Sequence, residues 1–75
     1  MTRTARPAFT LPAGAWGYIA RRADRPERLA LYDAQGRLNT SFGQDQGIME
    51  IDAILSRHGL LVSEQHATHA VVVVA

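Results

Sequence analysis

The chain has 75 residues, enough for one domain with a small core, because a protein of this size buries about 60% of the surface that its unfolded chain exposes. It contains no cysteine, which excludes disulfides and thiolate metal sites, and its formal net charge is only +1. The charges are unevenly distributed, since residues 1–37 hold seven arginines and three carboxylates, whereas residues 38–75 hold one arginine and four carboxylates. This asymmetry is typical of an interaction surface on the basic half.

The sequence predicts a cytoplasmic protein without a membrane span. Its amino-terminal residues lack the apolar run of a signal peptide. The longest wholly apolar run, residues 70–75, is too short to cross a bilayer.

The chain begins with a segment that we expect to lie outside the core. Residues 1–8 have the composition of a loose basic tail. Residues 9–11 have the pattern of a short edge strand, which Pro12 ends because proline has no N–H to donate to a neighbouring strand.

Residues 16–42 predict a meander of three antiparallel strands. The strands are expected at residues 16–22, 28–32 and 37–42, with turns at 24–27 and 33–36. Both turns contain residues that turns require: proline presets φ, aspartate bonds nearby backbone, and glycine accepts a positive φ.

Two four-residue turns would place Ala20 opposite Leu31 and Leu31 opposite Leu38. One face of the sheet would then be apolar and the other, the wet face, would be exposed to solvent. The expected apolar face comprises Trp16, Tyr18, Ala20, Leu29, Leu31, Leu38, Thr40 and Phe42. The expected wet face comprises Ile19, Arg21, Arg28, Ala30, Tyr32, Arg37, Asn39 and Ser41.

A shorter second turn is the alternative. A three-residue loop with a bulge at Gly36 would bring Leu38 beside Tyr32. Because a slip of one residue exchanges the two faces, the composition of each face depends on the lengths of both turns.

The apolar period then changes from 2 to 3.6, which predicts a helix at residues 46–58. Asp45 is the expected N-cap, and Gly59 fits the C′ position, followed by Leu60 packing back on the last turn. The apolar stripe comprises Ile48, Ile51, Ile54, Leu55 and His58.

Beyond the helix, residues 60–62 are expected to lead out of it and residues 63–67 to form a loop. Residues 68–75 are rich in valine, which predicts a strand that is central in the sheet or covered on both faces. Its position after a helix favours parallel pairing through a right-handed crossover. The predicted fold is therefore an α+β single domain of order β-β-β-α-β, with one helix packed on one sheet face.

No catalytic, metal or cofactor site is predicted. His66 and His69 are three residues apart and would point to opposite faces of a strand, while His58 lies in the helix. No serine lies in a nucleophile-elbow pattern. The sequence therefore favours a protein that is not an enzyme and holds no cofactor.

The basic meander is the predicted binding surface. Arginine and tyrosine are preferred anchors at protein interfaces, and they also contact phosphates and bases in nucleic acids. The alternative is a solvated sheet face whose arginines maintain solubility and block edge pairing. The candidate partner-binding residues are Arg21, Arg22, Arg25, Arg28, Tyr32 and Arg37.

The format of the chain resembles the small inhibitors made by phages and other mobile elements, of which anti-CRISPR proteins are the best known. The features that carry this resemblance are Arg21, Arg28 and Arg37 on a sheet, a single helix at residues 46–58, and a short valine-rich final strand. The resemblance implies stoichiometric binding to a nucleoprotein defence complex of a bacterial host, which blocks access to target DNA or its cleavage. The arginine surface suggests a partner with an acidic surface, and an exposed edge strand is compatible with a monomer or a weak dimer. The alternative is a small nucleic-acid-binding accessory protein of a phage or plasmid.

Overall fold

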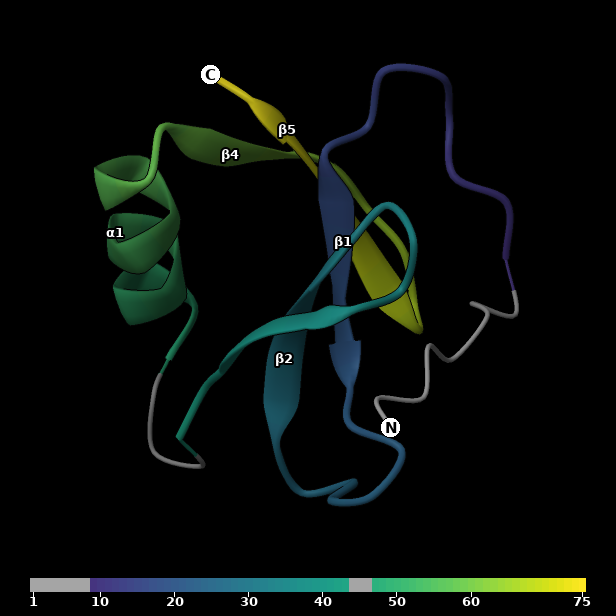
Figure 1. Cartoon of the computed structure of the whole chain (residues 1–75). Coiled ribbons are helices and arrows are strands. Elements are labelled where there is room, and N and C mark those ends of the chain that lie inside the picture. Colours follow the sequence, from purple (N-terminus) through teal and green to yellow (C-terminus); the bar gives the residue numbers. More distant parts are fainter. Residues whose placement is uncertain (1–8, 44–46) are drawn as a thin grey trace.

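Five antiparallel strands form one sheet in the computed structural model, which describes residues 9–43 and 47–75 and, of Ile48, only the backbone (Figure 1). The strands lie in the order β3-β2-β1-β5-β4, and one helix, α1, packs on one face. We call this the helix face and the opposite side the far face. The strands are β1 (Gly17–Arg21), β2 (Leu29–Asp33), β3 (Leu38–Ser41), β4 (Leu60–Gln65) and β5 (His69–Val74). The α+β class, the antiparallel meander and the helix packed on the sheet are confirmed.

The register of β1 on β2 differs from the prediction by one residue. Ile19 lies opposite Leu31 and Tyr18 opposite Tyr32, because the backbone N–H of Arg22 bonds to the carbonyl of Arg28 and leaves five residues in the connection. The predicted four-residue turn at 24–27 is therefore wrong. Ile19 belongs to the core under the helix, and Tyr18 lies on the far face.

The turn between β2 and β3 follows the shorter alternative. The N–H of Asp33 bonds to the carbonyl of Arg37, which leaves a three-residue loop, and Gly36 adopts a φ of 82°. One Asp33 carboxylate oxygen, Oδ1, accepts the backbone N–H groups of Gln35 and Arg37, both at 2.9 Å. Leu38 lies opposite Tyr32, with a bulge next to this pair.

The helix α1 spans Ile48–Arg57, and Gly47 is its N-cap without a side-chain hydrogen bond. The predicted cap, Asp45, lies outside the described residues. Gly59 has the expected positive φ of 70°, and Leu60 is buried in the core, so the predicted end of the helix is confirmed. His58 is exposed rather than part of the apolar stripe.

The carboxyl-terminal part contains one strand more than predicted. Most of the predicted loop at 63–67 belongs to β4, which pairs antiparallel with β5 through a hairpin in which the N–H of His66 bonds to the carbonyl of His69 at 2.8 Å. The predicted parallel crossover is therefore wrong, because β5 is antiparallel to both β4 and β1. Its central position is as expected, and this position explains why it is almost wholly apolar.

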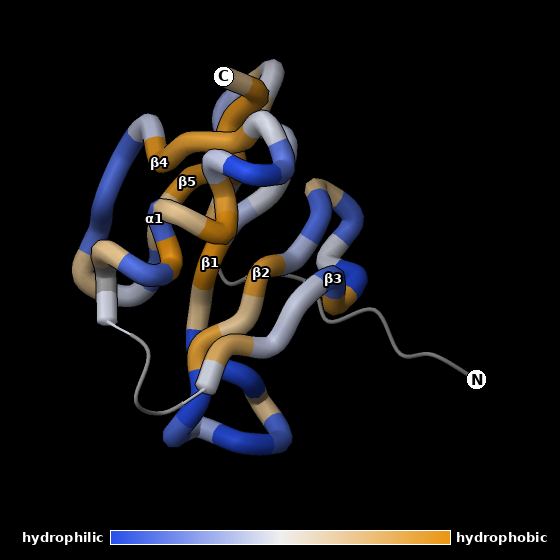
Figure 2. Tube along the Cα trace, turned by 90° about the vertical axis from the view of Figure 1, so that its left-hand side faces the viewer, coloured by the Kyte–Doolittle hydropathy of each residue, from blue (hydrophilic) through white to orange (hydrophobic). Residues whose placement is uncertain are grey.

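A cluster of buried side chains joins the helix to the helix face. Its buried members are Ile19, Leu31, Phe42, Ile51, Leu55, Leu60 and Val72. Trp16 and Leu29 pack against this cluster, as predicted. Hydrophobic residues follow β1, β4 and β5, whereas the β1–β2 connection at the lower end of the sheet is almost entirely hydrophilic (Figure 2).

The segment that precedes β1 forms no strand in its described residues, so the predicted edge strand at 9–11 is wrong. The predicted tail at 1–8 lies outside the described residues. Phe9 instead packs on the far face, where its ring meets Tyr18 edge to face at a centroid distance of 5.0 Å.

Candidate functional site

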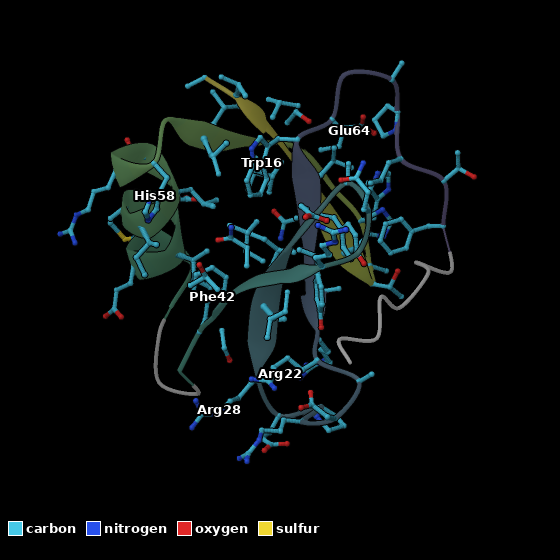
Figure 3. The ribbon with its side chains drawn as sticks, in the orientation of Figure 1. Trp16, Arg22, Arg28, Phe42, His58 and Glu64 are labelled. Atoms are coloured by element: carbon cyan, nitrogen blue, oxygen red, sulfur yellow. The ribbon has the colours of Figure 1, made fainter. Side chains whose placement is uncertain are left out.

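Four arginines gather where β1 passes into β2. We call this group, Arg21, Arg22, Arg25 and Arg28, the arginine hairpin. The backbone N–H of Arg28 bonds to the carbonyl of Arg25 at 2.9 Å, closing a turn around Pro26. Figure 3 shows Arg22 and Arg28 together at this end of the sheet. The connection is therefore a closed turn rather than an open loop, which limits the directions in which its side chains project.

Arg22 stabilises the hairpin from within. Its Nε and Nη2 donate to the two carboxylate oxygens of Asp24 at 2.9 and 2.6 Å, and Nη1 donates to Ser41 Oγ at 3.1 Å. The hydrogen bond with Asp24 raises the pKa of Arg22, and the same bond lowers the pKa of Asp24. With 19% of its side chain exposed, Arg22 connects the hairpin to β3 and has little surface left for a partner.

The other three arginines of the hairpin present their charge outward. Arg21 donates one hydrogen bond, from Nη1 to the carbonyl of Pro26 at 2.9 Å. Arg25 is exposed and Arg28 half-buried. Within residues 9–43 and 47–75, none of these three guanidinium groups lies within ion-pair distance of a carboxylate. Each guanidinium group therefore retains N–H groups that can donate hydrogen bonds to a carboxylate of a partner.

The predicted single arginine face is not formed. Arg21 lies on the helix face, whereas Arg28 and Tyr32 lie on the far face, because alternate residues of a strand point to opposite sides. Arg37 is in the β2–β3 turn, at the other end of β2, and the five residues of that strand correspond to roughly 17 Å. The hairpin arginines remain together because they are close in the chain.

A row of stacked rings crosses the far face, which sequence reasoning did not predict. Tyr32 stacks on Tyr18 at a centroid distance of 5.0 Å, Phe9 meets Tyr18, and Phe9 stacks on His69 at 3.5 Å. His69 in turn stacks on His66 at 4.6 Å. We call these five residues the aromatic row. The sequence feature that could have predicted this row is the pairing of Tyr18 with Tyr32, which requires the correct strand register.

Burial within the row changes two pKa values. Burial raises the pKa of the Tyr18 phenol, and the neighbouring Tyr32 and Asp33 act in the same direction. Burial also lowers the pKa of His69, the proximity of His66 lowers it further, and Glu64 opposes both effects. Both shifts favour the neutral form of the side chain.

The strand pattern predicted that His66 and His69 point to opposite faces, and this prediction is wrong. The two histidines flank the tight turn between β4 and β5, which brings their rings face to face. His66 Nε2 lies 3.2 Å from Glu64 Oε1. Over the part of the chain that the structure describes, no group of three or more histidine, aspartate or glutamate side chains is arranged to hold a metal ion.

A groove lies between α1 and the helix face, with a volume of about 570 Å³. Its apolar lining includes Ile19, Leu29, Ile51, Val62 and Ala70. Arg21 and Asp52 add opposite charges to its lining, Arg21 from the sheet and Asp52 from the helix. The groove was not predicted, because its walls come from β1, β2, α1 and the β4–β5 hairpin, which only the tertiary fold brings together.

Comparisons of the chain with protein-family models, with curated proteins and with solved structures give no match. In the described residues, no helix has the length and apolar character needed to cross a membrane.

Proposed function

We propose that this protein is a non-enzymatic, stoichiometric binding protein that docks through the arginine hairpin onto an acidic surface of a larger nucleoprotein complex and thereby inhibits it. The observation that supports this proposal is the grouping of Arg21, Arg25 and Arg28, whose guanidinium groups have no carboxylate partner in the described residues. Arginine forms paired hydrogen bonds with carboxylates and is among the residues that contribute most to protein interfaces.

The internal support of the hairpin favours tight binding. Arg22 joins Asp24 to Ser41, and the turn is closed by the bond between Arg28 and Arg25. A segment that is already ordered loses less conformational entropy when it binds than a free loop does. Bound to an acidic surface beside the path of the DNA, such a small protein can block the approach of DNA sterically, which is the mode of action implied by the resemblance to phage inhibitors.

Charge reversal tests this proposal. The variant Arg25→Glu/Arg28→Glu keeps the bonds of Arg22 but replaces two outward positive charges with negative ones. We expect the wild-type chain to form a 1:1 complex with a bacterial DNA-cleaving nucleoprotein effector and to stop its cleavage of target DNA. The double variant should lose at least about 100-fold in affinity, as expected for two interface arginines.

The matched control is Arg57→Glu, which reverses an exposed charge in the last turn of α1. It should bind and inhibit like the wild type. Circular dichroism of both variants checks that they are folded. If the folded double variant still captures and inhibits the effector, the arginine hairpin is not the contact.

A second candidate is binding to single-stranded nucleic acid, favoured by one observation. Half-exposed Tyr32 lies on the far face with Arg28 and already stacks on Tyr18, so a base could extend this stack while arginines contact phosphates. Fluorescence anisotropy with labelled oligonucleotides distinguishes the candidates. Nucleic-acid binding should weaken steeply with added salt, and the absence of binding even at low salt would exclude this role.

A further inference from the structure

The groove exists because one helix cannot cover a five-stranded sheet. Four spacings of about 4.8 Å make the sheet roughly 19 Å wide, whereas a helix with its side chains is about 10–12 Å across. The helix α1 contacts β4 and shares a core with β1 and β5. Part of the helix face is therefore left open between Ile51 of the helix and Leu29 of β2.

The part of the lining formed by β1, β2 and α1 suits an apolar group, and Gln65, His66, Thr68 and His69 of the β4–β5 hairpin add polar groups to the rest. Ile19, Val62 and Ala70 come from three adjacent strands and Ile51 from the helix, and all of them line the same space. Its volume of about 570 Å³ lies in the range of ligand sites and is sufficient for one large side chain with part of its backbone. An aromatic side chain placed there would gain the large burial that dominates interface energies.

The charges of Arg21 and Asp52 determine which charged groups can lie next to the apolar group of an occupant. Arg21 both lines the groove and belongs to the arginine hairpin, so the groove opens toward the basic end of the sheet. Only one of its five N–H donors bonds within the described residues, to Pro26. Asp52 on the opposite wall disfavours an anion within the groove and can accept a backbone N–H. The acidic group of an occupant therefore belongs at the Arg21 end, outside the apolar part.

We propose that the groove receives a large apolar side chain from an acidic peptide segment of the partner protein. In this arrangement the apolar residue is the anchor between α1 and the sheet, and the carboxylates that precede or follow it bind Arg21 and the neighbouring hairpin arginines. The proposal rests on the proposed function, because it assigns the chemistry of the partner to a site that shares Arg21 with the arginine hairpin.

Three synthetic peptides test the proposal on the full chain. The first has one tryptophan flanked by aspartates, the second has serine in place of tryptophan, and the third has lysines in place of the aspartates. Binding is followed through the amide signals of the ¹⁵N-labelled protein. We expect the first peptide to bind at least about tenfold more tightly than either of the others. Its signal changes should include Leu29 and Ala70 in the groove as well as Arg21.

The variant Ala70→Met places a flexible apolar side chain in the groove, and Ala53→Met, on the exposed side of α1, is the matched control. Binding of the tryptophan peptide should weaken about tenfold in Ala70→Met and stay unchanged in Ala53→Met. If Ala70→Met does not fold, the amide signal changes of the wild-type protein on adding the tryptophan peptide show whether the peptide binds in the groove.

The groove proposal is overturned if the serine peptide binds as tightly as the tryptophan peptide, if the lysine peptide binds better, or if the signal changes exclude the groove. Its failure is distinguishable from failure of the proposed function. If Ala70→Met inhibits the effector as the wild type does while Arg25→Glu/Arg28→Glu does not, the groove is not used and the hairpin still is. If the double variant inhibits, the hairpin contact is wrong whatever the peptides do.

Discussion

At the scale of single residues, two glycines are required for different physical reasons. A Cβ atom added at Gly17 would lie 2.0 Å from the carbonyl oxygen of Tyr32 on the neighbouring strand, a distance at which the strands must separate. At Gly59 the surrounding space is open, but its φ of 70° is unfavourable for residues that have a side chain. The first constraint concerns packing between strands, and the second concerns only the local backbone.

We expect Gly17→Ala to lower the free energy of unfolding by about 3 kcal/mol, at the upper end of overpacking effects, because β1 is central and its displacement disturbs the pairing with β2. Gly59→Ala should cost about 1 kcal/mol. Gly59→Asn should cost less than Gly59→Ala, since asparagine tolerates a positive φ. Urea unfolding followed by the fluorescence of Trp16 measures all three variants. Equal losses in Gly17→Ala and Gly59→Ala would contradict the predicted clash.

At the scale of elements, the sequence predicts where most strands and the helix lie but not how the strands are aligned. The spacing between Asp33 and Gly36 permits loops of three or four residues, and the choice between them appears only in the bonds that Asp33 makes. The β1–β2 connection has no residue that marks its length. A shift of one residue there exchanged Tyr18 and Ile19 between the two faces.

The strand β4 could not be predicted from its own residues. After Val62 its composition becomes polar, with Ser63, Glu64 and Gln65 at its end, and it contains a bulge. It forms a strand because its backbone pairs with that of β5. This pairing is a tertiary effect and not a local propensity of its residues. The helix, by contrast, was predictable because its apolar period and Gly59 are both local signals.

The same distinction applies to the candidate site. The hairpin arginines Arg21, Arg22, Arg25 and Arg28 are neighbours in the chain, so the sequence alone brings them together. The separation of Arg37 from them follows from the length of β2, whereas the position of Phe9 on Tyr18 and the opening of the groove depend on how the strands and the helix pack. These are the properties that sequence patterns specify least.

The β4–β5 hairpin should make stability depend on pH. Burial lowers the pKa of His69 below its ordinary value of 6.5, while Phe9, Tyr18 and His66 lie in the same row and Glu64 lies nearby. The unfolded chain therefore binds a proton more readily than the folded one. The contribution of neutral His69 is fully present above pH 6.5 and decreases as the pH falls from there through its lower folded-state pKa.

We expect the urea midpoint to decrease as the pH falls below about 6.5, and to decrease less in His69→Gln, which has no group to protonate. His58→Gln is the matched control, because His58 is exposed at the end of α1 and should leave the pH dependence as it is in the wild type. If His69→Gln and the wild type show the same pH dependence, the stacked His69 does not couple protonation to folding.

At the scale of the whole molecule, one hydrophobic cluster joins the helix to the sheet. Leu55 of α1 is fully buried in the same cluster as Leu31 of β2 and Val72 of β5. A domain of this length is stable by about 4–11 kcal/mol, so each large core side chain supports a substantial share of the total. The helix and the sheet should therefore unfold together.

Leu55→Ala tests this coupling. It should lower the free energy of unfolding by about 2–5 kcal/mol, because it removes a fully buried side chain and leaves a cavity. Met49→Ala is the matched control on the same helix, since Met49 is 86% exposed and its loss should change stability by less than about 0.5 kcal/mol. Unfolding is followed by far-ultraviolet circular dichroism, which reports the helix, and by fluorescence of Trp16, which packs against the core. Both signals should shift to the same lower urea midpoint in Leu55→Ala. A shift in circular dichroism alone would mean that the helix melts separately from the sheet, and the wall of the groove that carries Ile51 would then not be fixed.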